Sequence, residues 1–287
     1  MTKTIVPVNP VSEFTVGDEE IEQMVDELKK EGCWEDNDID HLSRSWIRAL
    51  MSQPYKKNKL KRRPFDYSKK KIMSYLDWRK KSGISSKIKN HFESDGAKFA
   101  KLTTSQGSLY WYGVDSEGSP NLWFHSSLIN FDKAVVKDEM ECTALIIQAA
   151  IDSMPDKIHN FNFILCFDKF DLVKAIKKPY LAPAFIKTFM VICPDRLKKA
   201  YFVTGAIGHI FYKVAKNVAP ASIMDKVTET RSREETAKLL VDECILDVTQ
   251  LPCFLGGAHD HQETITSHYP NMIQEIRKAM TVGITRI

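Results

Sequence analysis

Hydrophobic residues recur at helical spacing through the first part of the chain. Apolar positions three or four residues apart predict helices over residues 18–31, 38–51 and 66–80, and Asp66 is the expected N-cap of the third. The inward positions of the first helix are Ile21, Met24, Val25 and Leu28. We therefore expect a small all-α N-terminal lobe over residues 16–90, with a basic loop before its third helix.

After Gly83 the pattern changes to strands separated by helices. The segment GSLYWYGVDSEGSPNLWFHSS predicts two aromatic-rich strands around a turn marked by Gly and Pro. The apolar run NFNFILCF, residues 160–167, is typical of a strand covered on both faces. Further elements are predicted as helices over 138–153, 178–192, 207–218 and 221–227, and as a strand over 200–203. This order predicts an α/β domain with a largely parallel sheet and covering helices.

These patterns divide the chain of 287 residues into four parts. Residues 1–15 are expected to be a flexible N-terminus, and the helical lobe follows at 16–90. The α/β domain is expected over 91–260, and residues 261–287 are expected to form a C-terminal tail.

The formal charge of +4 conceals a strong asymmetry. Residues 1–40 contain 12 acidic and 3 basic residues, whereas residues 55–90 contain 14 basic and 2 acidic ones. The basic stretch predicts attraction to an anionic surface, either phospholipid or nucleic acid, and its alternative is a solvated face neutralised by the acidic N-terminus. The candidate basic patch consists of Lys57, Lys59, Lys61, Arg62 and Arg63.

Several other classes of protein find little support in the sequence. No apolar run approaches the roughly 20 residues of a membrane-spanning helix, and the N-terminus has no run suited to a signal peptide, so we expect a cytoplasmic protein. The six scattered cysteines favour buried thiols over disulfides or zinc ligands. The segment HDHQE, with His259, His261 and Glu263, lacks the spacing of a zinc site and predicts a polar loop. Neither a metal site nor an enzymatic activity is expected.

The predicted helix over residues 207–218 carries one continuous apolar stripe. The stripe includes Ile207, Ile210, Phe211, Val214 and Val218, while the polar positions His209, Lys213, Lys216 and Asn217 lie away from it. Periodicity favours a helix that covers the sheet. The alternative is a movable wall over an apolar cavity.

Several short motifs together resemble one known family. The segments CPDRLKKAYFV, APASIMDKV and LPCFLGG, in this order, are similar to the signature of the CRAL-TRIO lipid-binding family, which includes phosphatidylinositol-transfer proteins. GVDSEGSP and RPFDYSKKKIMSYLDWRKKSG resemble that family's hairpin and the end of its helical lobe. The resemblance covers roughly residues 40–260. Asp195 replaces the usual Glu, Thr204-Gly205-Ala206 replaces an Asn-x-Pro step, and Ser119 replaces an Arg, as in a divergent member.

The resemblance implies a CRAL-TRIO-type fold that holds a single lipid in an apolar cavity closed by a gate helix. Phosphatidylinositol or another phospholipid is the first ligand it implies, with Asp195 and Lys226 at the headgroup. The expected cavity and gate residues are Phe185, Phe189, Met190, Tyr201, Ile207, Ile210, Phe211, Val214 and Val218. Gly205 and Gly208 would form the hinge.

The implied activity is transfer of this lipid between membranes, which requires neither catalytic residues nor a cofactor other than the bound phospholipid. The expected protein is a monomer that contacts an anionic membrane surface transiently. The alternatives are a binding protein for a tocopherol- or retinoid-like ligand, and a scaffold without exchange activity. Nucleic acid is not expected as a partner, although aromatic residues within the basic stretch leave stacking on a single strand as a further alternative.

Overall fold

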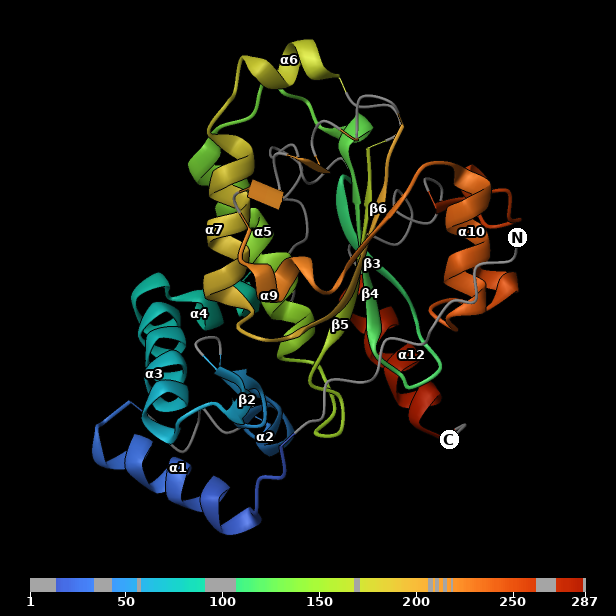
Figure 1. Cartoon of the computed structure of the whole chain (residues 1–287). Helices are drawn as coiled ribbons and strands as arrows, with labels where there is room; N and C mark the ends of the chain where they lie inside the picture. Colours follow the sequence, from blue (N-terminus) through green and yellow to red (C-terminus); the bar gives the residue numbers. More distant parts are fainter. Residues whose placement is uncertain are drawn as a thin grey trace.

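The computed structural model describes residues 14–33, 43–55, 58–90, 107–167, 171–205, 209, 212–213, 216–217, 219–261 and 272–285. Its first part is a helical lobe, drawn in blue and cyan in Figure 1. The helices of this lobe are α1 (Asp18–Lys30), α2 (Arg44–Met51), α3 (Phe65–Ser82) and α4 (Ile84–Ile88). Its strands are β1 (Pro54–Tyr55) and β2 (Asn58–Arg62).

The lobe has a hydrophobic core of its own. The four positions predicted to face inward from α1 are buried, together with Trp46 and Ile47 of α2 and Ile72 of α3. The N-cap of α3 is Pro64, and the predicted cap Asp66 lies instead in the first turn. An acidic residue there stabilises the helix through the dipole, without a capping hydrogen bond. The spacing of apolar residues was thus sufficient to locate these helices.

A short antiparallel hairpin replaces the basic loop expected before α3. Strand β1 pairs with β2 through Pro54 and Arg62 and through Tyr55 and Asn58. Four of the five residues of β2 are exposed. The hairpin therefore has no buried face, and its sequence lacks the alternation of apolar and polar residues that would predict a strand.

The second part is built on a five-stranded sheet in the order β3-β4-β5-β6-β7. These strands are β3 (Leu109–Val114), β4 (Pro120–His125), β5 (Phe161–Cys166), β6 (Leu197–Val203) and β7 (Val227–Thr230). Strands β3 and β4 are antiparallel, and every pair from β4 to β7 is parallel. This largely parallel sheet is the one that the alternation of strands and helices predicted.

Helices cover both faces of the sheet. In Figure 1, α5 (Val136–Ile151) and α7 (Leu181–Ile192) lie on one side, and α10 (Arg233–Asp242) lies on the other. The shorter helices are η5 (Ser126–Leu128), α6 (Leu172–Ile176), α9 (Ala221–Met224), η6 (Val248–Gln250) and η7 (Cys253–Leu255). No helix in the described ranges combines the length and apolar character needed to span a bilayer.

The last described element is α12 (Met272–Thr285), within the part of the chain expected to be a tail. Met272, Ile276 and Met280 are buried, and the Met272 sulfur accepts the N–H of Trp111 in β3 at 3.2 Å. Their spacing of four residues places them on one face of the helix. The tail therefore includes a helix that packs against the edge of the sheet.

Candidate functional site

An apolar cavity of about 200 Å³ lies between the sheet and helices α5 and α7. Phe163 and Leu165 of β5 line it, as do Ala200 and Phe202 of β6. Side chains alternate between the two faces of a strand, so the intervening residues point to the opposite face. Helix α5 contributes Met140 and Thr143, helix α7 contributes Leu181, Ala182, Phe185, Ile186 and Phe189, and α9 contributes Ile223 and Met224.

Two of the residues predicted to line the cavity, Phe185 and Phe189, lie in its lining. Phe185 and Phe189 lie one helical turn apart on α7, with ring centroids 6.1 Å from each other. The Phe189 ring stacks on Phe163 of the sheet, with centroids 5.4 Å apart. These rings form a continuous apolar wall from helix to sheet.

Two other predicted cavity residues have different positions. Met190 follows Phe189 by about a quarter turn of the helix, and its side chain is 43% exposed. Tyr201 lies between Ala200 and Phe202, so it faces the other side of the sheet, where its hydroxyl donates to Glu243 at 2.7 Å. Neither Met190 nor Tyr201 is therefore among the described residues that line this cavity.

The predicted gate residues Ile207, Ile210, Phe211, Val214 and Val218, and the hinge residue Gly208, lie outside the described residues. Of the polar positions predicted to lie away from the stripe, Lys213, Lys216 and Asn217 are described and exposed. His209 Nδ1 lies 2.5 Å from the Glu229 carboxylate of β7. The predicted hinge residue Gly205 lies two residues beyond Val203, the last residue of β6.

The two predicted headgroup residues flank the start of β6. Asp195 occupies the turn before this strand with a φ of 58°, and its carboxylate accepts from Arg63 at 2.7 and 3.2 Å and from Lys71 at 2.8 Å. Burial would raise the pKa of Asp195, but the hydrogen bond from Arg63 and the charge of Lys71 outweigh it and lower this pKa to about 2. Lys226 donates to the carbonyl of Leu197 at 2.5 Å, and Leu197 lines the cavity. An ionic cluster thus lies at the amino end of β6, beside the cavity.

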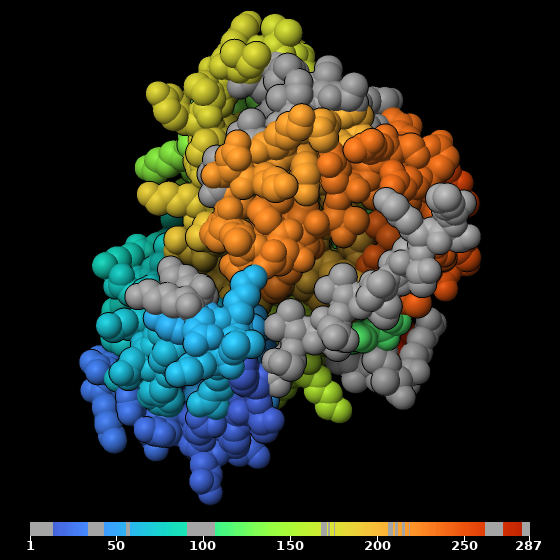
Figure 2. Space-filling model, viewed as in Figure 1, coloured from blue at the N-terminus to red at the C-terminus, as the bar shows by residue number. Residues whose placement is uncertain are grey.

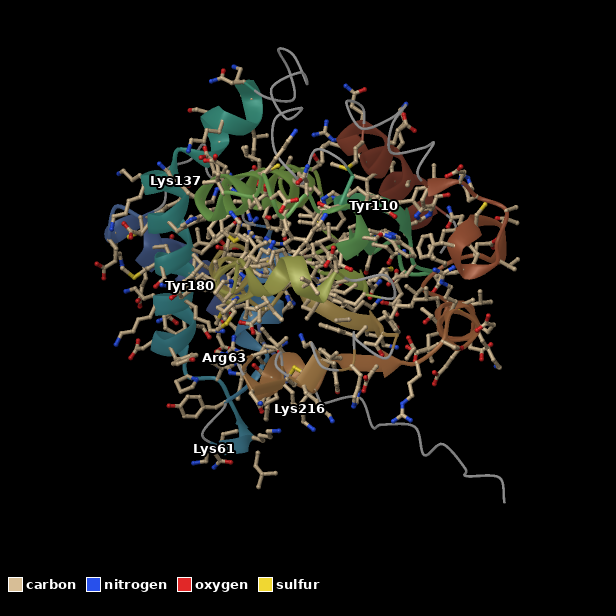
Figure 3. All side chains as sticks on the ribbon, turned by 90° about the horizontal axis from the view of Figure 1, so that it is seen from above. Lys61, Arg63, Tyr110, Lys137, Tyr180 and Lys216 are labelled. Carbon is tan, nitrogen blue, oxygen red and sulfur yellow. The ribbon has the colours of Figure 1, made fainter. Side chains whose placement is uncertain are left out.

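The predicted basic patch is smaller than the sequence suggested. Arg63 is only 8% exposed, and Arg62 forms an ion pair with Glu20. Lys59 lies 3.4 Å from Asp225 of the segment after α9, and Figure 2 shows the light-blue hairpin against this orange segment. Lys61 is exposed at the outer part of the hairpin, while Arg63 lies closer to the body of the protein (Figure 3). Lys57 lies outside the described residues.

The helical lobe is joined to the α/β domain by buried polar contacts that the sequence did not reveal. Arg79 of α3 pairs with both carboxylate oxygens of Asp152, at 2.8 and 3.0 Å, and also donates to Gln148 of α5. The indole N–H of Trp46 donates to the carbonyl of Pro194 at 3.0 Å. These contacts place the lobe beside the turn that contains Asp195.

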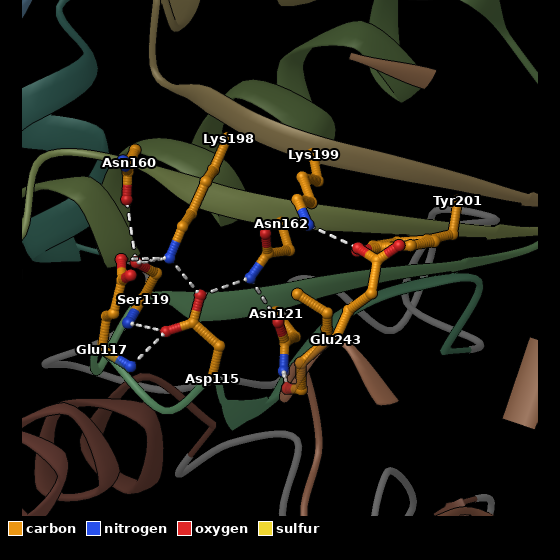
Figure 4. A network of polar contacts seen from close by, with 11 residues as sticks. Asp115, Glu117, Ser119, Asn121, Asn160, Asn162, Lys198, Lys199, Tyr201 and Glu243 are labelled. Carbon is orange, nitrogen blue, oxygen red and sulfur yellow. Dashed lines mark hydrogen bonds and ion pairs between the residues drawn. The ribbon is translucent and has the colours of Figure 1, made fainter. Parts of the chain in front are cut away.

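At the turn of the GVDSEGSP motif, Asp115 forms an ion pair with Lys198 of the strand β6 (Figure 4). Asp115 accepts from the backbone N–H groups of Glu117 and Ser119 at 3.0 and 2.8 Å. Lys198 of β6 donates to the second Asp115 oxygen at 2.7 Å. Lys198 therefore supplies a positive charge at this turn.

The HDHQE segment was expected to be a polar loop, but His261 is only 4% exposed. Its Nδ1 atom lies 2.7 Å from the hydroxyl of Tyr110, which also lies 3.1 Å from Nε2 of His125. Burial and the neighbouring His125 and His259 lower the pKa of His261 to about 2. His261 is therefore a neutral member of an aromatic cluster, and Glu263 lies outside the described residues.

The largely parallel sheet, the helical lobe and the apolar cavity are typical of α/β proteins that bind small hydrophobic ligands. Residues 104–257, more than half of the chain, match the family model of the CRAL/TRIO domain. The chain therefore belongs to the CRAL/TRIO family, and this membership supports binding of a lipid or another small hydrophobic ligand.

Among solved structures, the chain is similar to the crystal structure of Sfh5, with a TM-score of 0.57. The two are 12% identical, and the match covers 91% of this chain and 100% of Sfh5. The match supports the fold over this 91% of the chain. The comparison with curated proteins found no match.

Proposed function

We propose that this protein binds a single lipid in the cavity and transfers it between membranes, with phosphatidylinositol as the first ligand. The observation that carries the proposal is the apolar lining, in which Phe163, Phe185 and Phe189 form one wall. Taking an acyl chain out of a bilayer costs about 0.8 kcal/mol for each CH₂ group. A lipid can leave the membrane only if a comparably apolar space receives its chains.

The ionic cluster beside the cavity supports an inositol phospholipid as the ligand. Arg63, Lys71 and Lys226 are cations that can pair with a phosphate, and the Asp195 carboxylate can accept hydrogen bonds from inositol hydroxyls. In the described structure Asp195 is engaged by Arg63 and Lys71. Binding of the headgroup would exchange part of these contacts for contacts to the ligand.

The hairpin of the lobe supports an encounter with an anionic membrane surface. Lys59 and Lys61 flank Leu60, whose side chain is 89% exposed. Each well-placed Lys adds about 1 kcal/mol of attraction to such a surface, and an exposed Leu can insert among the headgroups. The activity is non-covalent throughout, so the proposal assigns no catalytic residue.

The proposal is tested by extracting lipids from the purified protein and by a transfer assay between two populations of liposomes. We expect phosphatidylinositol to co-purify, and we expect the protein to move labelled phosphatidylinositol from donor to acceptor vesicles. Recovery of no lipid, together with no transfer above the rate without protein, would contradict the proposal.

A further inference from the structure

Four large apolar side chains are exposed on two segments of the α/β domain. Val135, Val173, Ile176 and Tyr180 are 54%, 71%, 66% and 77% exposed, and together they are called the α6 patch below. Val173 and Ile176 lie three residues apart on α6, so they share one face of that helix. Single exposed apolar residues are common on protein surfaces, whereas a group of them indicates contact with a partner.

Polar contacts hold the two segments of the α6 patch side by side. The ammonium of Lys178 donates to the carbonyl of Ala134 at 2.9 Å, and the Lys174 ammonium lies 3.8 Å from the Asp132 carboxylate. One segment follows β4 and the other follows β5, and these two parallel strands end at the same edge of the sheet. The α6 patch therefore lies at this edge, at the end of the α/β domain away from the helical lobe (Figure 1).

The α6 patch borders the apolar cavity. Pro179 and Leu181 both line the cavity, and Tyr180 of the patch lies between them in the chain. Phe131 and Lys178, which flank the contact between the two segments, line the cavity as well. An apolar surface beside a cavity for lipids is suited to contact with the structure that supplies the lipids, which is a bilayer.

Lysines surround the α6 patch. The exposed cations of the two segments are Lys133, Lys137, Lys174 and Lys177. Asp132 and Asp171 lie 3.8 and 3.9 Å from Lys174, so they offset part of this charge and leave an excess of positive charge. Lys137 and Tyr180 lie on the same side of the molecule in Figure 3. Apolar side chains among lysines are typical of surfaces that bind anionic headgroups and insert between them.

Resting on the proposed transfer function, we propose that the α6 patch docks the protein on an anionic bilayer. Val173 and Ile176 insert among the headgroups, and the surrounding lysines pair with lipid phosphates. This surface is separate from the hairpin of the lobe, because α6 and β2 lie in different parts of the molecule (Figure 1). Docking brings one end of the cavity to the bilayer, so the α6 patch controls the rate of lipid exchange and not the affinity of the cavity.

The alternative occupant of the α6 patch is a second copy of this chain. In a two-fold dimer the same surface faces itself, so the lysines of one copy would lie opposite those of the other. Like charges placed across an interface disfavour association. The positive charge around the patch therefore favours an anionic bilayer over a second copy.

The first test places a fluorescent reporter in the α6 patch. In Ile176→Trp, brominated acyl chains should quench the new indole when it lies in the bilayer. With vesicles of brominated phosphatidylcholine and phosphatidylserine, we expect more quenching of Ile176→Trp than of the unmodified protein. The control is Val248→Trp, at a position 64% exposed in η6, which follows α10 in the chain, and it should show no gain.

Two results of this test would overturn the docking surface. One is the absence of additional quenching for Ile176→Trp in protein that sediments with the vesicles. The other is quenching that persists in the supernatant after the vesicles are removed, because it reports a brominated lipid in the cavity and not contact with a bilayer. Ile176 is exposed, so its replacement disturbs no buried contact.

The second test introduces negative charge into the α6 patch. Joint Val173→Glu and Ile176→Glu should weaken binding to anionic vesicles about ten-fold and slow transfer by a similar factor, because carboxylates are repelled by the headgroups and do not insert. The variant should still carry lipid in native mass spectrometry, and Val248→Glu should match the unmodified protein. Unchanged vesicle binding would overturn the proposal, as would a dimer of the unmodified protein that the double variant abolishes.

The outcomes separate this inference from the proposed function. A protein that neither carries nor transfers lipid, but shows quenching of Ile176→Trp by vesicles, would lack the transfer function and retain the docking surface. A protein that carries and transfers lipid without this quenching would retain the function and lack the docking surface.

Discussion

Replacing Asp195 by Asn tests whether the ion pairs of this residue stabilise the fold. The carboxylate lies between Arg63 and Lys71, and its side chain is 15% exposed. Asn removes the negative charge with little change of shape. It also tolerates the left-handed backbone conformation, so the φ of 58° adds little strain in the variant. The substitution therefore isolates the electrostatic contribution.

The size of the expected effect follows from the pKa of Asp195. Folding lowers this pKa from 3.8 to about 2, and a drop of one pH unit in pKa corresponds to about 1.4 kcal/mol. The charged form therefore stabilises the native state by about 2 kcal/mol at neutral pH. Because the folded pKa is the lower one, this stabilisation is complete above pH 4 and disappears as the pH falls toward 2.

The assay is urea unfolding of both proteins at pH 7 and at intervals down to pH 2. We expect Asp195→Asn to lower the free energy of unfolding by about 2 kcal/mol at pH 7 and to lose this deficit in acid. The control is Asp225→Asn, which removes the exposed pair with Lys59 and should cost less than about 1 kcal/mol. Equal stability of Asp195→Asn and the unmodified protein at pH 7 would refute the reasoning.

Three further variants test other parts of the protein. Lys226→Ala should weaken binding of phosphatidylinositol relative to phosphatidylcholine in the liposome transfer assay, and an unchanged ratio would reject a headgroup role for Lys226. His261→Phe should flatten the dependence of stability on pH below 6.5, because the unfolded chain gains a proton that the buried imidazole, with its pKa of about 2, does not take up. Urea unfolding of both proteins between pH 7 and 5 measures the slope of this dependence, to which His261 contributes about 1.4 kcal/mol for each pH unit in the unmodified protein. An equal slope in the variant would argue against a buried, neutral His261. Joint replacement of Lys59 and Lys61 by Glu should weaken binding to anionic vesicles in a sedimentation assay and leave neutral vesicles unaffected, whereas equal binding would exclude the hairpin as the contact.

Much of the fold was predictable because the helices of the lobe and of the α/β domain have long, regular apolar faces. Helices α3, α5 and α7 and strands β5 and β6 all formed where the pattern predicted them. The hairpin was missed because the residues of β2 are mostly exposed and carry no alternation. Helix α12 was missed although the spacing of Met272, Ile276 and Met280 was visible in the sequence.

The candidate site was less predictable because it depends on which way each side chain points. Phe185 and Phe189, one helical turn apart on α7, both line the cavity, whereas the neighbouring Met190, which was expected there as well, does not. For Tyr201, the sequence showed an apolar strand but not which of its faces covers the cavity. The pairing of Arg63 with Asp195 joins residues 132 positions apart, and a local pattern contains no information about such a contact.

Residues Ala200 and Tyr201 provide a direct test, because they are adjacent in β6 and point to opposite faces of the sheet. Ala200 lines the cavity, so Ala200→Phe would fill part of its volume of about 200 Å³. Tyr201→Phe removes only a hydroxyl on the far face and is the matched control.

The decisive measurement is native mass spectrometry of the unmodified protein and both variants after incubation with liposomes. We expect a bound lipid on the unmodified protein and on Tyr201→Phe, and little or none on a folded Ala200→Phe. Lipid bound equally by Ala200→Phe, or absent from the unmodified protein, would contradict the claim that this cavity holds the ligand.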